Sequence, residues 1–487
     1  MNNTVPFSQR SIDNILDETI SKIRAKFIEF SSTFKVPSVS FALILDNEIV
    51  HEDAFGSSRI TPALHAQPEH LYRIASMTKS FTASCILILR DNGRLSLDDP
   101  IAKWLPLTKH LKYPTLDSPD ITVRSLLTMS SGLVEDDPWA DRLLNLGLRD
   151  FEKMLESQVA FNHVPGLEYE YSNLGYALLG QVVAKVTGKS LRRFAEEELL
   201  SPLGLTSTIW ENKETPPDLQ AFGYSVSNGE WVHEPALEDG VFGAMGGLSS
   251  TVIDLAKYIL FHLDAWPPRN DTDNTVLRRS SRREMAQIHQ VITKPKDESP
   301  AITLQGYGYG LAIAHHEYLG QIIGHSGGVP GFTSRMEWLP TFGAGIVALC
   351  NRTYVPIGKI AREALELLHQ EQLLSKPKKE PSESLVEFQR VVVKLYQRFD
   401  QDLLRSSVCE TYFLDRDDER RPPDFLSLRK TYGSLISHSQ IVPDGYLRGS
   451  WKMQCQGGEL EVSIMLSPTL PSKIQFIKVI PRPNNSK

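Results

Sequence analysis

Ser76 and Lys79 are the residues whose types and spacing point most directly to chemistry, because Ser-Met-Thr-Lys places a hydroxyl and an amine three positions apart. If these residues begin a helix, positions i and i+3 share one face and the two side chains can meet. A serine hydroxyl needs a base to take its proton, and a lysine with a lowered pKa can be that base. The helix N-terminus would also favour a developing oxyanion. An N-capping serine followed by a surface lysine gives the same short pattern.

A second group of interest is Tyr171-Ser172-Asn173, which lies on a loop ahead of an apolar helical segment. A phenol close to a lysine can share its proton and act as a general acid or base. The amide of Asn173 could hold a substrate carbonyl. Loop packing by Tyr171 and helix capping by Asn173 would explain the same residues without any chemistry.

A third group is Gly324-His325-Ser326-Gly327-Gly328, which follows a strand-like run. Its small residues would let a substrate backbone run along a strand edge, and its histidine could donate to a substrate carboxylate or carbonyl. A glycine-rich hairpin turn with an incidental histidine would have the same composition.

The same five residues satisfy G-x-S-x-G, the nucleophile elbow of α/β-hydrolases, in which Ser326 would be the nucleophile. That elbow needs a helix directly after the serine. Here Val329-Pro330-Gly331 follows, and then an alternating strand-like run over residues 332–339, so the elbow is the weaker interpretation.

Taken in this order, the three groups resemble the active-site set of the serine β-lactamase and penicillin-binding-protein family. The flanking sequences are similar to that family as well, and the resemblance extends over residues 36–351; its flanking segments are residues 72–83, 91–101, 121–133 and 246–251. Within the family, the chain looks more like class C β-lactamases, D-amino-acid-releasing peptidases and related esterases than like class A enzymes.

The resemblance implies an α+β fold, with an antiparallel sheet flanked by helices, a mostly helical subdomain and the site between them. It implies that Ser76 forms an acyl-enzyme and that Lys79 and Tyr171 move protons, in an order that stays open. It also implies that the backbone N–H groups of Ser76 and Gly328 form an oxyanion hole. The residues that would contact the substrate are Asn173, His325, Ser326, Gly327 and Gly328.

The sequence departs from the family pattern at His325, where relatives usually carry lysine. An unperturbed histidine titrates near pH ~6.5, whereas lysine is a cation throughout the neutral range. Recognition of the carboxylate of a β-lactam should therefore be weaker. We expect a serine acyl-enzyme hydrolase or acyltransferase that takes a small amide, peptide or ester. A β-lactamase proper and a non-catalytic sensor or scaffold of the same fold are the alternatives.

Hydrophobic periodicity predicts the elements that would position these residues. Helices are expected over residues 11–30, 76–90, 122–129, 175–187, 190–200 and 252–263, and strands over residues 39–45, 49–54, 308–314, 321–324, 333–339 and 344–349. The first and last strands could share one antiparallel sheet with helices packed on it.

The chain is long enough for more than one core. We expect a catalytic domain over residues 1–374 with a polar insertion near 265–300 that contains a short helix. A linker is expected over residues 375–384 and an accessory domain over 385–487, with a helix at 385–399 and a β-rich remainder.

Composition limits the kinds of binding partner and the cellular compartment that we expect for this protein. The 487 residues carry a formal net charge of −7, which argues against a nucleic-acid partner. We see no signal peptide or membrane span, and four widely spaced cysteines favour a reduced, cytoplasmic protein. His315-His316 lacks a carboxylate at metal-ligand spacing, so neither a metal nor another cofactor is expected. The oligomeric state is open.

Overall fold

The computed structural model describes residues 7–157, 159–210, 215–235, 237–293, 299–376, 380–414 and 423–483. These residues belong to two compact units, one within residues 1–376 and the other within residues 377–487. Five residues of the expected polar insertion, 294–298, and three of the expected linker, 377–379, lie outside the described ranges.

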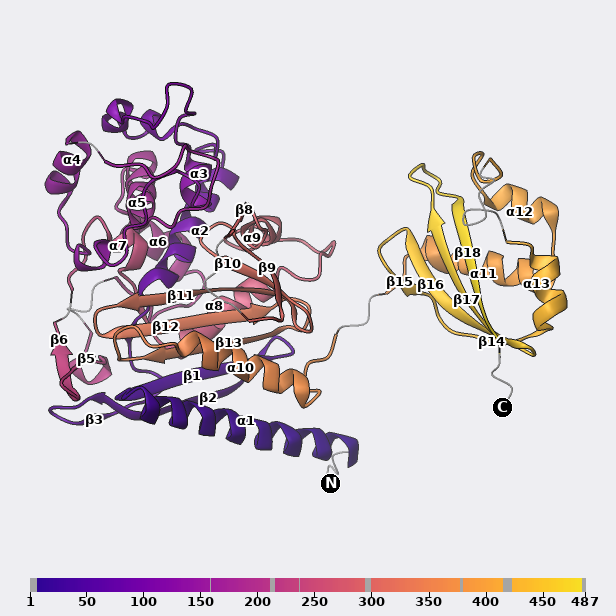
Figure 1. Ribbon diagram of the computed structural model, residues 1–487, viewed down its shortest axis with the longest axis horizontal. Coiled ribbons are helices and arrows are strands. Elements are labelled where there is room, and N and C mark those ends of the chain that lie inside the picture. The colour runs from indigo at the N-terminus through magenta and orange to yellow at the C-terminus, as the bar shows by residue number, and fades with distance from the viewer. Residues whose placement is uncertain are drawn as a thin grey trace. The chain divides into compact units, whose positions relative to one another are not determined.

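A nine-stranded antiparallel sheet forms the centre of the first unit (Figure 1). Its strands come from both ends of the unit, since β1 pairs with β2 on one side and with β13 on the other, as the sequence suggested. In spatial order they are β3 (Leu64–His65), β2 (Glu48–Arg59), β1 (Ser38–Leu45), β13 (Ala344–Cys350), β12 (Phe332–Leu339), β11 (Gly320–Val329), β10 (Ala312–His316), β9 (Ile302–Tyr307) and β8 (Gln290–Val291).

Helices cover both faces of this sheet. α1 (Phe7–Thr33) and α10 (Ile357–Gln370) pack on one face, and α8 (Val252–Leu263) packs on the other (Figure 1). Successive side chains of a strand point to opposite faces, so Phe41 joins the core with α1 while Ala42 joins the core with α8. Every residue of β1 is buried, and apart from Ser38 and Ser40 all of them are apolar, as expected for a central strand covered on both faces.

A mostly helical part lies over the α8 face and surrounds helix α2, whose residues 78–89 are all buried. Its helices are α2 (Thr78–Asp91), α3 (Val123–Leu127), α4 (Leu148–Glu156), α5 (Asn173–Thr187), α6 (Leu191–Ala195), α7 (Gly243–Gly246) and α9 (Arg279–Met285), with a π-helical turn at Glu196–Leu200. Two small antiparallel pairs lie outside the main sheet: β4 (Tyr72–Arg73) with β7 (Ser249–Ser250), and β5 (Gly223–Ser227) with β6 (Glu230–Glu234). The expected fold class, an antiparallel sheet flanked by helices with a mostly helical part, is confirmed.

One predicted strand is wrong. The run 308–314 is not a single strand, because β9 ends at Tyr307 and β10 begins at Ala312. The residues between them turn the chain: Gly308 donates its N–H to the carbonyl of Leu311, and Gly310 has a φ of +69°. Glycine adopts that left-handed conformation without steric cost, which explains the glycine at position 310.

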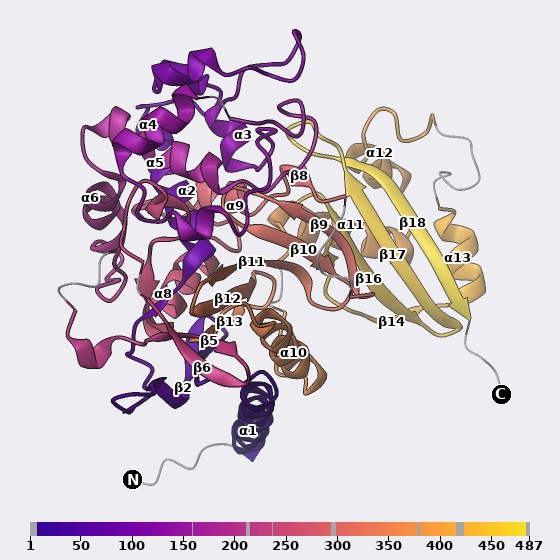
Figure 2. The ribbon, with the colours of Figure 1, turned by 60° about the vertical axis from the view of Figure 1, so that its left-hand side comes forward.

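The second unit has its own core. Helices α11 (Glu383–Gln397), α12 (Gln401–Ser407) and α13 (Phe425–Tyr432) accompany an antiparallel sheet (Figure 2). Its strands are β14 (Leu435–His438), β15 (Val442–Pro443), β16 (Arg448–Cys455), β17 (Gly458–Leu466) and β18 (Ile474–Pro483). Alternate residues of β17 are buried and pack with Leu385 and Val392 of α11. The expected β-rich remainder is confirmed.

None of the helices within the described residues combines the length and the apolar character that a bilayer crossing requires.

Candidate active site

Ser76 lies in a tight 3₁₀ turn, Ala75–Met77, between strand β4 and helix α2. Ala75 has a φ of +48°, which places the residue before the serine in a left-handed conformation that non-glycine residues rarely adopt. Neighbours hold this backbone in place, because Ile74 donates to the carbonyl of Leu248 at 3.0 Å and accepts from the Ser334 hydroxyl at 2.8 Å. Such strain persists where the surroundings enforce it, and it is common at functional sites.

Lys79 is fully buried in the first turn of α2, and its Nζ lies 2.9 Å from Ser76 Oγ. The same nitrogen lies 2.7 Å from Asn173 Oδ1 and 3.1 Å from the carbonyl oxygen of Met245. As an ammonium, Lys79 donates to all three oxygens. As a neutral amine it keeps two N–H groups, which the two carbonyl oxygens accept, and its lone pair then faces the Ser76 hydroxyl.

Burial lowers the pKa of Lys79 from its usual value to about 8, because the ammonium loses its hydration. The negative charges of Asp137, Asp141 and Asp136 oppose part of this shift. At pH 7, about a tenth of Lys79 is therefore neutral, whereas an exposed lysine would be almost entirely charged.

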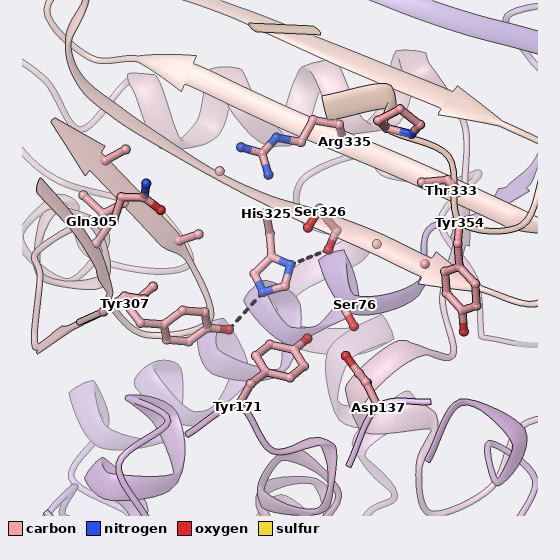
Figure 3. A pocket seen from close by; sticks show the side chains of 18 of the residues that line it. Ser76, Asp137, Tyr171, Gln305, Tyr307, His325, Ser326, Thr333, Arg335 and Tyr354 are labelled. Carbon is pink, nitrogen blue, oxygen red and sulfur yellow. Dashed lines mark hydrogen bonds between the residues drawn. The ribbon is translucent and has the colours of Figure 1, made fainter. Parts of the chain in front are cut away.

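Tyr171 stands on the loop ahead of α5, with Lys79 Nζ 4.8 Å from the centre of its ring. Its phenol oxygen points toward Ser76 (Figure 3). Burial raises the pKa of Tyr171 well above 10, Asp137 raises it further, and a hydrogen bond with Ser76 acts in the opposite direction. Tyr171 is therefore a neutral phenol at physiological pH and has a proton to give.

Asn173 has contacts that differ from those the sequence suggested. It is fully buried as the first residue of α5, while Ser172 caps that helix by accepting from the N–H of Gly175. Its Oδ1 accepts from Lys79 and its Nδ2 donates to Asp137, so both ends of the amide are engaged. Asn173 holds the lysine, and it is absent from the cavity wall described below.

His325 is buried within β11, and both of its ring nitrogens are engaged (Figure 3). Nδ1 lies 2.5 Å from the carbonyl oxygen of Ser326, which can only accept, so Nδ1 carries the proton. Nε2 then accepts from the Tyr307 hydroxyl at 3.0 Å. Burial, followed by the charge of Lys79, lowers the pKa of His325 to about 3. The imidazole is neutral at physiological pH and has no N–H left for a substrate carboxylate.

Ser326 is exposed in the middle of β11, opposite Arg335 of β12. The strand continues to Val329, and a turn through Gly331 then leads directly into β12. A nucleophile elbow would need a helix after the serine. The α/β-hydrolase interpretation is therefore wrong, because Ser326 sits in a regular antiparallel strand.

Gly327 and Gly328 let other parts of the site approach β11 closely. A Cβ on Gly327 would lie 2.1 Å from the carbonyl oxygen of Ile74, and one on Gly328 would lie 2.8 Å from the ring of Tyr354. The nucleophile turn can reach the strand only because the first of these residues has no side chain.

A cavity of about 890 Å³ opens over Ser76 and runs along β11. Ser76, Tyr171, His325, Ser326, Gly327 and Gly328 all line it, whereas Lys79 and Asn173 lie behind its wall. The remaining lining residues are Asp137, Pro138, Asp141, Tyr169, Ile292, Gln305, Gly306, Tyr307, Ala312, Ile313, Ala314, Ile322, Gly324, Thr333, Arg335, Tyr354, Val355, Pro356 and Arg362.

Sequence reasoning missed the acidic side chains of this cavity. Asp137 and Asp141 come from the segment that follows α3, and Tyr354 comes from the segment between β13 and α10. The available signal was Glu-Asp-Asp at residues 135–137 followed by Asp141, a cluster of acids directly after an apolar segment. No spacing rule connects such a cluster to a serine more than fifty residues earlier.

Comparison with known proteins defines the class. The family model described as Beta-lactamase matches residues 23–370, which is most of the chain. The chain therefore belongs to the β-lactamase family, whose members are serine hydrolases of the β-lactamase and penicillin-binding-protein type.

The individual relatives share only a modest sequence identity with this chain. Protein flp of Staphylococcus aureus strain MRSA252 is 27% identical over 357 residues, covering 72% of this chain and 64% of that protein. Penicillin-binding protein 4* of Bacillus subtilis strain 168 is 26% identical over 318 residues, covering 59% of this chain and 62% of its own length. The chain thus spans less than two thirds of either relative.

Among solved structures, the octameric penicillin-binding protein homologue from Pyrococcus abyssi has a TM-score of 0.62 and 24% identity. The similarity covers 95% of this chain and 98% of that one. This likeness concerns the fold.

Proposed function

We propose that the protein is a serine acyl-enzyme hydrolase for a small amide, peptide or ester, with Ser76 as nucleophile. One observation carries the proposal: the buried Lys79 Nζ lies 2.9 Å from Ser76 Oγ, with two carbonyl oxygens holding its other hydrogens. An amine held in this way directs its lone pair at the hydroxyl proton.

In acylation, neutral Lys79 takes the proton of Ser76 while Oγ forms a bond to the substrate carbonyl carbon. The carbonyl oxygen becomes an oxyanion, for which the backbone N–H groups of Ser76 and Gly328 are the proposed donors. Tyr171 gives its proton to the departing nitrogen or oxygen as that bond breaks, and it recovers a proton from Lys79. The raised pKa of Tyr171 supports this donor role.

In deacylation, water or another acyl acceptor attacks the ester carbonyl of acyl-Ser76. The acceptor's proton passes to neutral Lys79, directly or relayed through the Tyr171 hydroxyl, and Lys79 returns it to Ser76 Oγ as the acyl group leaves. Asn173 acts as a positioning residue, because it fixes Lys79 and does not line the cavity. Water is the ordinary acyl acceptor, so we expect hydrolysis. A competing nucleophile would give acyl transfer instead.

The lack of charge on His325 favours amide and ester substrates over β-lactam antibiotics. A lysine at this position would offer a cation to the antibiotic's carboxylate, whereas His325 is neutral and both its nitrogens are engaged. The experiment is a rate profile across a p-nitrophenyl ester, an amino-acid p-nitroanilide and a chromogenic cephalosporin. We expect turnover of the ester or anilide, with the cephalosporin at least ~10-fold slower, the effect of losing one charge-assisted hydrogen bond.

Ser76→Ala is the matched control for that profile and should abolish every activity. Fast cephalosporin turnover would make the protein a β-lactamase proper. Stoichiometric labelling of Ser76 without turnover would indicate a sensor of the same fold.

A further inference from the structure

Two carboxylates on the cavity wall play no part in the acyl-transfer steps above. Asp137 and Asp141 line the cavity with Ser76, and the Asp137 carboxylate points toward the serine (Figure 3). Their neighbour Asp136 has a structural role, because it accepts from the N–H groups of Asn173 and Leu174 at 2.7 and 2.8 Å. It thereby caps the start of α5.

The hydrogen-bond donors to Asp137 and Asp141 are neutral groups. Asp137 Oδ1 accepts from the amide of Asn173, and Asp141 Oδ2 accepts from the hydroxyl of Tyr354. Each carboxylate therefore keeps a second oxygen that these bonds do not use. Asp141 is buried, whereas Asp137 is exposed at the mouth of the cavity.

The hydrogen bonds that Lys79 and Arg142 make within the described residues go to groups other than Asp137 and Asp141. Lys79 donates to Ser76, Asn173 and the Met245 carbonyl. Arg142 pairs with Glu234 at 3.4 Å. On the other side of the cavity, two arginines, Arg335 and Arg362, pair with one buried carboxylate, Glu337. Within the described residues, the wall formed by Asp137 and Asp141 thus presents an excess of negative charge.

That excess affects the proposed reaction. An oxyanion forms at the carbon bonded to Ser76 Oγ, and carboxylates close to it raise its energy. A substrate that brings a positive charge to the same wall would offset this repulsion and would gain charge-assisted hydrogen bonds.

We propose that the acyl part of the substrate carries a protonated amine, which binds to Asp137 and Asp141 beside Tyr354. The inference rests on the proposed function. Tyr171, the proton donor for the leaving group, and Tyr307 and His325 lie to one side of Ser76, whereas Asp137 and Tyr354 lie to the other (Figure 3). The leaving group therefore extends along the Tyr307 side and the acyl group along the Asp137 side. The substrate class is an aminoacyl ester or amide, including a peptide with a free amino end.

The test compares two boronic acids that form reversible adducts with a serine nucleophile. (Aminomethyl)boronic acid and ethylboronic acid differ by an ammonium group in place of a methyl group. Their inhibition constants are measured on the full chain, as protection of Ser76 from a fluorophosphonate label. We expect the amine to bind ~10-fold to ~100-fold more tightly, as for hydrogen bonds to charged groups. Asp137→Asn and Asp141→Asn should each reduce the ratio of the two constants by ~10-fold.

The ratio is the readout because a loss of affinity shared by both compounds cancels in it. Asp150→Asn is the matched control, since this aspartate is exposed on α4, pairs with Lys153 and is not among the cavity residues; its ratio should equal that of the wild type. Equal binding of the two compounds by the wild type would overturn the proposal, and so would a ratio that survives both cavity variants. The wild-type comparison decides even if a variant fails to fold. Failure of Ser76 to take the label at all would instead contradict the proposed function.

Discussion

Ser76 and Ser326 line the same cavity, yet their surroundings differ in the features that make a serine nucleophilic. Ser76 is buried in a strained turn, 2.9 Å from Lys79 Nζ and in contact with Tyr171. Ser326 is exposed in a regular strand, and the adjacent His325 uses both ring nitrogens elsewhere. Each serine lies in a recognisable short motif, so the comparison teaches that an available base, held at the right distance, distinguishes a nucleophile from a wall residue.

The largest expected effect is that of Ser76→Ala. Removing the nucleophile should reduce kcat/KM for an ester or anilide by at least ~10⁴-fold, the scale seen when a catalytic serine is removed. Steady-state kinetics on the purified variant would measure this loss, and an unchanged melting temperature would show that folding is intact. A variant that kept a tenth of the activity would remove the distinction between the two serines.

Lys79→Ala tests whether the base makes that distinction. General acid–base catalysis contributes ~10²-fold to ~10⁴-fold, so we expect a loss within this range while the protein remains folded. Loss of a buried cation should not unfold the chain, because the variant removes a charge that burial already disfavours. Near-normal kcat/KM in a folded variant would contradict the role given to Lys79.

The pH profile sharpens the same point without a substitution. Burial lowers the pKa of Lys79 to about 8, and the base is the neutral form, so kcat/KM should rise with pH by roughly tenfold per unit below that value and then level off. His325 has a pKa of about 3 and contributes no step in this range. A flat profile between pH 6 and pH 8 would exclude a lysine of this pKa as the base.

Gly327→Ala tests the close approach between the nucleophile turn and β11. The added methyl group would meet the Ile74 carbonyl at 2.1 Å and Ser334 Oγ at 2.4 Å. Overpacking of this kind costs about 2 kcal/mol, so the free energy of unfolding in urea should fall by that amount. Gly147→Ala is the control, because a methyl group there meets nothing within 4 Å. Equal stability of the two variants would contradict the contact.

The smallest effect is expected for Ser326→Ala. If its hydroxyl only contacts substrate, the loss in kcat/KM should stay below ~10-fold, the value of one neutral hydrogen bond. The fluorophosphonate label should still attach to Ser76. A loss as large as that of Ser76→Ala would reverse the comparison.

Many of the helices and strands could be predicted from the sequence, because the spacing of apolar residues indicates which side chains are buried. Helix α8 coincides with the predicted run 252–263, and the pairing of the first and last strands followed from their apolar character. The turn at residues 308–311 was missed, because aromatic residues between glycines also look like a strand. The short motifs predicted which residues surround Ser76. The contacts that these residues make depend on tertiary packing, which the motifs do not describe. Neither the engagement of His325 by Tyr307 nor the approach of Asp137 and Asp141 to the cavity is encoded in local spacing.

The central claim is that Ser76 is the serine that reacts. A fluorophosphonate can be added to the wild-type chain, followed by trypsin digestion and mass spectrometry. Trypsin cleaves after Arg73 and Lys79, so an adduct on Ser76 appears as a mass increase on the peptide of residues 74–79. We predict stoichiometric modification of that peptide, with the rate of modification falling in Lys79→Ala. Modification of the peptide that contains Ser326, with residues 74–79 unmodified, would contradict the account.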